Sequence, residues 1–450
     1  MILSLVFMVL AALFAANLLF ARPVRFSLFL IASCVLSFGA ETDGLGSLAN
    51  LSAIWLLCLL ALSLIAAGIL ARTRVPWSPA EVCYALFLGW CAVESLRAAE
   101  ISYAVRALLR LSFPFLSMYL ARRSINSEAI ASQLLGYQFA MTFGSGLICC
   151  GMMVLPALFA WVVGLVWYGA VFFDHASIIA MLALAVWSVR RDFKSLLLAI
   201  FLAAICLRAV NRTTMMALAV GASVFCLLEF RKLAVLLLPA LYATLLAVLL
   251  LIPAFREKMF YSSDKADDSA LLASGDLDTK QINNNGRFAM WDIVLSRFFK
   301  PNPFMGSGLG STQAWFYSGA AKEAGCGNLK VEHSEYVRLL SDTGLIGATL
   351  FIVSIGAAGL DGARALRRSR QPMGHAYAVA AVCAGPVFLV CMGFDNALLY
   401  VIPVAQLPFA LSAIALRLSA ATGATLPVAP RDVADNMRWM PLQPLRPHSL

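Results

Sequence analysis

Long apolar runs dominate this sequence and recur at lengths of about 20 residues up to position 253 and again after position 342. A helix of ~20 apolar residues crosses the ~30 Å hydrocarbon core of a bilayer, and lipid offers its backbone polar groups no partner. Of the 450 residues, 61% are hydrophobic and only 13% are charged, whereas in soluble proteins roughly a quarter of all residues are charged. The sequence therefore predicts an all-α polytopic integral membrane protein.

The apolar runs predict twelve or thirteen transmembrane helices. The first run, 1–20, has no basic region at its start, so we do not expect a cleaved signal peptide. The other expected spans are 26–40, 49–70, 80–96, 101–120, 130–156, 174–189, 195–211, 213–230, 233–253, 343–360, 374–394 and 397–418. They divide the chain into an N-terminal helix bundle (1–253), one large loop (254–341), C-terminal transmembrane helices (342–418) and a tail (419–450) that we expect to be disordered.

Short basic connections orient these spans, because loops rich in arginine and lysine stay in the cytoplasm. The connections contain Arg72 and Arg74, Arg122 and Arg123, Arg190 and Arg191, Arg231 and Lys232, and Arg367, Arg368 and Arg370. With all of them inside, the alternation of spans places the large loop on the outer side of the membrane and the tail in the cytoplasm. The net charge of +10 lies in these connections and the tail, so it indicates topology and not nucleic-acid binding.

Apolar residues recur at helical spacing after residue 286, at Phe288, Trp291, Leu295 and Phe298, before Pro301 ends the run. This pattern predicts a short amphipathic helix in the large loop that can lie on the bilayer. Arg287 stands at its N-terminal end, where a guanidinium and free backbone N–H groups can face an anion together. The alternative is an arginine that only caps the helix or reaches the headgroups.

Two other stretches of the large loop resemble ligand sites only weakly. Gly306–Ser311 is rich in glycine, but no Lys-Ser or Lys-Thr pair follows the glycines and no strand precedes them. This stretch predicts a plain turn and not a phosphate-binding loop. Asp276 and Asp278 have the spacing of a metal-binding Asp-x-Asp pair, but three residues in an acidic segment do not predict a metal. We therefore expect no metal and no cofactor.

His333 lies between two carboxylates, Glu332 and Glu335, just before the chain re-enters the membrane. An imidazole with a pKa near neutrality beside carboxylates suits a general base. A solvated surface histidine remains the alternative.

Arginines inside the apolar runs are a separate signal, because a charge within a bilayer costs several kcal/mol and is usually functional. Arg106 and Arg110 are four residues apart in one run, and Arg208 and Arg212 repeat this spacing near the end of another. With Arg287 they would form a cationic pocket for a lipid-linked diphosphate, since guanidinium groups match phosphate oxygens. The alternative for each pair is an arginine whose side chain reaches nearby headgroups.

The order of several motifs resembles the O-antigen ligase and polysaccharide polymerase superfamily of bacterial envelopes. The motifs are Asn211-Arg212-Thr213, Gly286-Arg287-Phe288-Ala289-Met290-Trp291, Asn302-Pro303-Phe304-Met305-Gly306-Ser307-Gly308 and the stretch His333–Gly347, and the resemblance covers roughly 205–360. It implies an enzyme of the bacterial inner membrane that transfers a glycan from undecaprenyl diphosphate to a sugar hydroxyl at the periplasmic face, without metal or cofactor. Ser334 departs from the pattern, because many members have asparagine after the loop histidine.

The resemblance assigns roles to individual residues. It makes Arg212 and Arg287 the diphosphate-binding residues and His333 the base that activates the acceptor hydroxyl. We add further candidate substrate-binding residues, which are Arg208, Arg106, Arg110, Glu335, Arg338 and Trp291. The expected reaction is an in-line displacement that inverts the anomeric configuration.

The acceptor stays open at this stage, because it is the lipid A core in a ligase and another lipid-linked repeat in a polymerase. A transporter or flippase for the lipid-linked glycan is the rival class, since arginines within spans also line substrate paths. The single large loop and the lack of matched halves speak against it.

Overall fold

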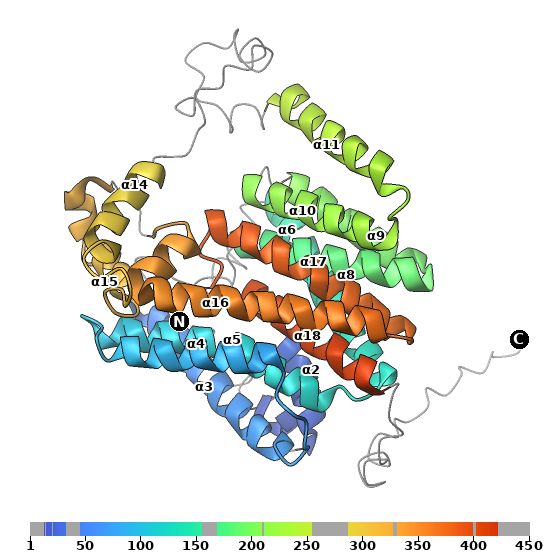
Figure 1. Ribbon diagram of the computed structural model, residues 1–450, viewed down its shortest axis with the longest axis horizontal. Helices are drawn as coiled ribbons and strands as arrows, with labels where there is room; N and C mark the ends of the chain where they lie inside the picture. The colour runs from blue at the N-terminus through green and yellow to red at the C-terminus, as the bar shows by residue number, and fades with distance from the viewer. Residues whose placement is uncertain are drawn as a thin grey trace, which may run out of the picture.

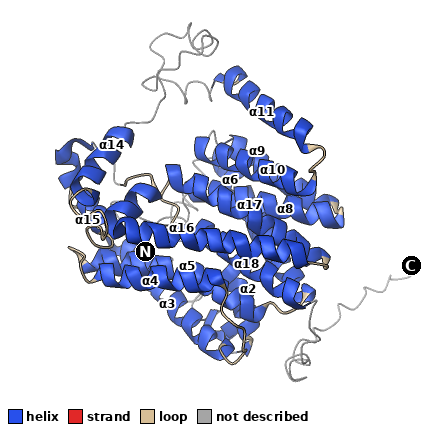
Figure 2. Ribbon diagram, viewed as in Figure 1, coloured by secondary structure: helices blue, strands red, loops and turns tan. Residues whose placement is uncertain are grey.

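The computed structural model describes residues 13, 15–19, 21–32, 46–154, 169–208, 211–253, 287–326, 331–398 and 402–421. All regular elements in these residues are helices, which confirms the predicted all-α fold (Figures 1 and 2). Most of the first expected span, the Asp276 and Asp278 pair, and the tail after residue 421 lie outside the described residues.

Most of the long helices follow the expected spans to within a few residues, whereas the helix Glu335–Arg368 extends eight residues beyond each end of the expected span 343–360. They are α2 (Pro23–Ala32), α3 (Gly46–Leu70), α4 (Pro79–Ser95), α5 (Ile101–Ser124), α6 (Glu128–Val154), α8 (Gly169–Arg190), α9 (Phe193–Arg208), α10 (Arg212–Glu229), α11 (Ala234–Leu251), α16 (Glu335–Arg368), α17 (Pro372–Phe394) and α18 (Ile402–Ala421). Among the described helices, α5, α6, α8, α10, α16 and α17 contain segments long and apolar enough to cross a membrane. The structure thus supports a multi-pass membrane protein, and the larger number of spans remains a prediction.

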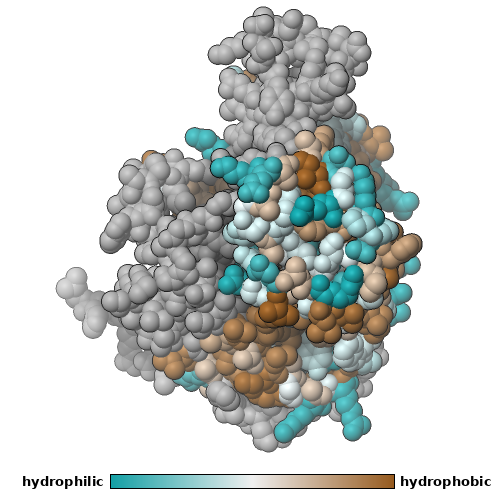
Figure 3. Space-filling model, turned by 90° about the vertical axis from the view of Figure 1, so that its left-hand side faces the viewer, coloured by the Kyte–Doolittle hydropathy of each residue, from teal (hydrophilic) through white to brown (hydrophobic). Residues whose placement is uncertain are grey.

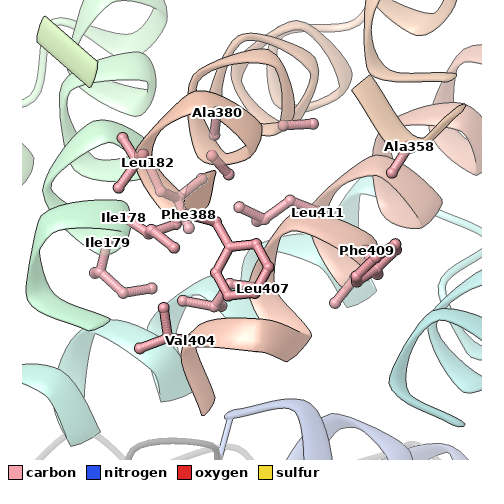
Figure 4. Close-up of a cluster of buried hydrophobic side chains, with 14 of the residues drawn as sticks. Ile178, Ile179, Leu182, Ala358, Ala380, Phe388, Val404, Leu407, Phe409 and Leu411 are labelled. Atoms are coloured by element: carbon pink, nitrogen blue, oxygen red, sulfur yellow. The ribbon is translucent and has the colours of Figure 1, made fainter. Parts of the chain in front are cut away.

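The core of the bundle forms around α17, which packs against α8, α10, α16 and α18. Figure 4 shows the ring of Phe388 pointing toward Leu407, with Ile178 and Leu182 on the neighbouring helix. Most buried positions of α17 are small, so the adjacent helices approach closely, as is common in membrane proteins. In contrast, α11 lies at the edge of the bundle beside α10 (Figure 1).

Polar contacts join the predicted cytoplasmic connections at one end of the bundle. Arg122 and Arg123 at the end of α5 both bind the buried carboxylate of Glu81 at the start of α4. Four further hydrogen bonds join residues at or next to the helix ends on this side. These contacts are Arg123 Nη2 to Val75 O, Arg190 Nη2 to Ser132 Oγ, Met373 N to Glu128 Oε1, and His375 Nε2 to Glu229 Oε1. The basic connections therefore share one end of the molecule, as the predicted orientation requires.

The helix α16 is broken at Gly344, whose φ of 65° and ψ of −170° are not helical. The turn at 303–308 supplies the hydrogen bonds that the break removes. Leu345 N donates to Pro303 O (2.8 Å) and Ile346 N to Phe304 O (3.2 Å). On the other side of the break, Ser341 O and Asp342 O accept from Ser307 N and Gly308 N at 2.9 and 3.1 Å.

This pairing satisfies backbone groups that lipid could not. The plain turn expected at Gly306–Ser311 is thus part of a backbone junction between the large loop and α16. We call these four hydrogen bonds between residues 303–308 and 341–346 the splice. The helix also begins at Glu335, before the expected start of the membrane span at 343, so the predicted loop boundary at 341 falls inside α16.

Candidate functional site

The end of the bundle opposite the basic connections is covered by short helices of the large loop. They are α14 (Arg287–Val294), η3 (Leu295–Phe299), α15 (Ser311–Tyr317) and η4 (Lys322–Cys326), of which η3 and η4 are π-helices. Figure 3 looks onto this end and shows polar residues over its upper part with hydrophobic residues gathered below them.

The predicted helix after residue 286 exists, and three of its four predicted apolar residues, Trp291, Leu295 and Phe298, lie partly buried against the protein. Met290 and Val294 are its buried residues and pack with Trp315, Phe316 and Val337 in a small core. Phe288, which we expected on the apolar face, is 52% exposed. The prediction missed the two most buried residues, because the helix packs on protein through Met290 and Val294 and leaves only Phe288 of the predicted face exposed.

Arg287 opens α14 and reaches the loop between α17 and α18. Its Nη1 donates to Phe394 O at 2.8 Å. Burial lowers the pKa of Arg287, while the neighbouring Asp395 carboxylate raises it and the Arg212 guanidinium lowers it further. Two predicted diphosphate-binding arginines are therefore electrostatic neighbours, with a carboxylate beside them.

Asp395 also faces the predicted base. His333 Nδ1 and Asp395 Oδ1 are 4.0 Å apart, and both side chains are about one-third exposed. Sequence reasoning missed Asp395, although a charged residue between two apolar runs could have drawn attention to it. A histidine beside a carboxylate and within reach of solvent can accept a proton from a hydroxyl.

The backbone of His333 is held in the left-handed region with a φ of 50°, which few residues other than glycine adopt. Neighbouring contacts hold this conformation in place. Trp291 Nε1 donates to Glu332 O at 2.7 Å, and Asn396 Nδ2 donates to Glu332 Oε2 at 2.8 Å. Such strain costs ~1–3 kcal/mol and concentrates at functional sites.

Arg212 is the first residue of α10, and its position is fixed from both sides. The Asn211 side chain caps the helix by accepting from Thr213 N at 3.0 Å. One turn into the helix, Thr214 Oγ1 donates to Asp174 Oδ1 of α8 at 3.1 Å, and Asp174 is fully buried. Sequence reasoning missed Asp174, although an aspartate within an apolar run could have drawn attention to it.

The described geometry thus brings Arg212, Arg287, His333 and Trp291 into one neighbourhood. Residues 196–352 match the family model described as O-Antigen ligase. Residues 196–352 are therefore similar to an O-antigen ligase domain. The match confirms the sequence resemblance and supports glycan transfer of the ligase or polymerase type. The domain includes those four residues, whereas Asp395 lies beyond the matched segment. No curated protein matches the chain.

Behind the site, the matched segment contains a buried ion network on α16. Arg338 Nε donates to Glu335 Oε2 at 2.7 Å, and Arg338 Nη1 lies 3.8 Å from Asp342 Oδ2. Glu335 Oε1 accepts from Leu398 N, so the network reaches the loop that carries Asp395. All three side chains are at most 1% exposed.

The Asp342 carboxylate in turn fixes the glycine turn of the domain. It accepts hydrogen bonds from Gly310 N, Thr312 N and Thr312 Oγ1 at 2.9 to 3.0 Å. The donors that a phosphate loop would need are thus used inside the protein, which agrees with the predicted turn.

The remaining predicted arginines lie in other places. Arg106 is on α5, 5.8 Å from the ring of Tyr103, and that ring stacks on Tyr317 of α15. Arg110 is buried one turn further along α5. Arg208 ends α9, whereas Arg212 begins α10. These two arginines belong to different helices, so their four-residue spacing does not place them on one helical face.

Proposed function

We propose that this protein is an inner-membrane glycosyltransferase that moves a glycan from undecaprenyl diphosphate to a sugar hydroxyl at the periplasmic face. The observation that carries the proposal is the approach of His333 and Asp395 beside Arg287, within or next to the matched domain. The proposed base, His333, therefore lies near the cations Arg287 and Arg212. Transfer from a diphosphate leaving group requires both kinds of residue in one site.

The two arginines bind the donor in this proposal. Arg287 and Arg212 are close enough to influence each other's charge, so an anion between them would relieve their repulsion. Guanidinium groups bind phosphate oxygens through paired hydrogen bonds, and they stabilise the charge that develops as the diphosphate leaves. Arg208, Arg106 and Arg110 remain candidates for longer-range contacts with the donor or the acceptor glycan.

His333 acts on the acceptor. It takes the hydroxyl proton as the acceptor oxygen bonds to the anomeric carbon and the bond from this carbon to the diphosphate oxygen breaks. Asp395 faces Nδ1 and favours the tautomer that leaves Nε2 to accept the proton. The attack comes from the face opposite the leaving group, so the anomeric configuration inverts, and no covalent enzyme intermediate, metal or cofactor takes part.

We assign positioning roles to the buried partners of these residues. Trp291 holds the carbonyl of Glu332 next to the base, and Asp174 holds the first turn of α10 next to Arg212. Glu335 and Arg338 are fully buried against each other, so we place them behind the substrate and not in contact with it.

Purified full-length protein with a lipid-diphosphate donor tests the proposal. Transfer should proceed without ATP or a membrane potential, and His333→Ala should abolish most turnover while donor binding stays nearly intact. A protein that only moves the lipid across vesicle membranes would be a transporter. Full activity of His333→Ala would remove the histidine from the mechanism.

The acceptor separates ligase from polymerase. Glu335 and Arg338 next to the histidine resemble exopolysaccharide polymerases as much as ligases, so these motifs leave both open. The surface glycan of a deletion strain decides between them. Single repeats without long chains indicate a polymerase. Long chains that accumulate on undecaprenyl diphosphate indicate a ligase acting on the lipid A core.

A further inference from the structure

The turn that splices into α16 carries two exposed apolar side chains at its tip. Phe304 is 65% exposed, and Met305 beside it is also exposed. Both belong to the loop that the sequence places outside the membrane. Exposed apolar side chains that gather on a surface mark a site of contact with another apolar phase or molecule.

Backbone hydrogen bonds fix the height of this tip along the bundle. Ile346 N donates to Phe304 O, so Phe304 lies level with Ile346, just after the break of α16 at Gly344. On the other side, Arg97 Nη2 donates to Gly306 O at 3.4 Å, and Leu309 N donates to Glu94 O. The turn is therefore level with the end of α4 as well.

The exposed apolar residues at this level come from three separate parts of the chain. We name them the turn patch, which consists of Val93, Leu96, Phe304, Met305, Leu345 and Ile346. The surface of α16 below the patch is also apolar and exposed, at Ile352 and Val353. The turn patch is thus continuous with a surface that a membrane-spanning helix presents to lipid.

The length of α16 places the patch at a membrane boundary. From Ile346 to Arg367 the helix rises ~32 Å, and the hydrocarbon core of a bilayer is ~30 Å thick. Arg367 belongs to the basic end, which marks one headgroup layer. The indole of Trp90, which donates to Thr343 O at 3.0 Å, is half-buried at the patch level, where tryptophan is typical of the opposite boundary.

We propose that the turn at 301–306 is seated in the bilayer, with Phe304 and Met305 among the phospholipid acyl chains at this boundary. The splice with α16 makes this possible, because irregular backbone at membrane depth must find its hydrogen-bond partners inside the protein. If the proposed function holds, the seated turn also sets the height of the transfer site at the headgroups, where a lipid diphosphate lies.

Photo-crosslinking tests which molecule occupies the patch. The full-length protein, with p-benzoylphenylalanine in place of Phe304, is irradiated in vesicles of phosphatidylethanolamine and phosphatidylglycerol, and its intact mass is measured. The matched control carries the same group at Lys322, an exposed position of η4 in the same loop. We expect at least about tenfold more phospholipid adduct at 304 than at 322, because only the seated side chain contacts acyl chains.

Two outcomes would overturn the proposal. Equal amounts of phospholipid adduct at the two positions would show that the turn lies in water. Covalent dimers formed through position 304 would show that the turn patch is an interface between two copies of this chain.

Thiol accessibility gives an independent measurement that does not depend on the crosslinker. Phe304→Cys should react with an impermeant maleimide at least about tenfold more slowly than Lys322→Cys in the same vesicles, because the reagent stays in water. Both should react alike after denaturation in detergent and urea. Equal rates in the intact vesicles would contradict a membrane-seated turn, whatever the enzyme activity proves to be.

Discussion

Gly306 and Gly344 lie backbone to backbone where the large loop joins α16. A Cβ atom on Gly344 would stand 2.2 Å from Phe304 O, and one on Gly306 would stand 2.6 Å from Gly344 N. Both glycines have positive φ, of 78° and 65°. This contact is what allows four backbone hydrogen bonds to cross the break, so any side chain here must separate the loop from the helix.

Gly344→Ala should therefore destabilise the protein by more than the ~1–2 kcal/mol that a left-handed conformation costs alone, because the new methyl group also meets backbone. Gly359→Ala, on the same helix, is the matched control. Nothing lies within 4 Å of its added Cβ, so we expect no loss and a gain of up to ~1 kcal/mol. The thermal midpoint in detergent measures both, and equal midpoints would contradict the splice.

Arg287→Ala should weaken donor binding. The loss of one charge-assisted hydrogen bond of ~1.5–3 kcal/mol predicts a rise in the KM for the lipid-diphosphate donor of roughly 10- to 100-fold. Arg297→Ala is the control, because Arg297 is an exposed cation of the adjoining η3 that contacts Phe298 and Trp315. An equal rise in the donor KM of both variants would show that only the general surface charge matters.

Asp395→Asn should lower kcat and leave the donor KM nearly unchanged, because Asp395 acts through His333. General-base catalysis contributes about 10²- to 10⁴-fold, and we expect the aspartate to account for part of this. The double variant with His333→Ala should be no slower than His333→Ala alone, since residues that act as a unit are not additive. Asp292→Asn, at an exposed position of α14, is the control. Additive losses would show that the two residues act separately.

Arg338→Met should destabilise the fold by ~3–5 kcal/mol, because it leaves the buried Glu335 and Asp342 carboxylates without their cation. Adding Glu335→Gln should restore part of the stability. Arg364→Met is the control on the same helix, where the arginine is half exposed, so its loss should destabilise the fold by less. Denaturation in detergent compares the three proteins. If Arg338→Met proved as stable as Arg364→Met, the network would not hold the site in place.

Orientation can be measured in spheroplasts with an impermeant thiol reagent. A cysteine at the exposed Lys322 should react, and one at the exposed Arg370 should not, because the loop and the basic connections face opposite sides. Ser311 is less suitable as a probe, since the structure buries it. Labelling at 370 with protection at 322 would show that the membrane orientation is the reverse of the predicted one. The proposed site would then face the cytoplasm.

The sequence by itself determined the helical class, the approximate ends of the long helices and the short helix that Arg287 opens. Apolar runs and helix-ending residues such as Pro301 are local, and the bilayer makes helix formation within each run obligatory. The O-antigen ligase resemblance was equally local, since it depended on short motifs and their order. For these reasons the structure and the family match confirmed the fold class and the domain.

Only the tertiary structure decided which polar residues meet. Asp395 and His333 are far apart in the chain, and their approach depends on how α17 packs beside α16. The same holds for the contact between Gly306 and Gly344, which breaks a helix that periodicity alone would continue. Spacing along the chain fixes neighbours only within one helix, so it does not apply to Arg208 and Arg212, which belong to α9 and α10. Contacts between segments follow from packing and from the need to satisfy buried polar groups, and these act after the helices have formed.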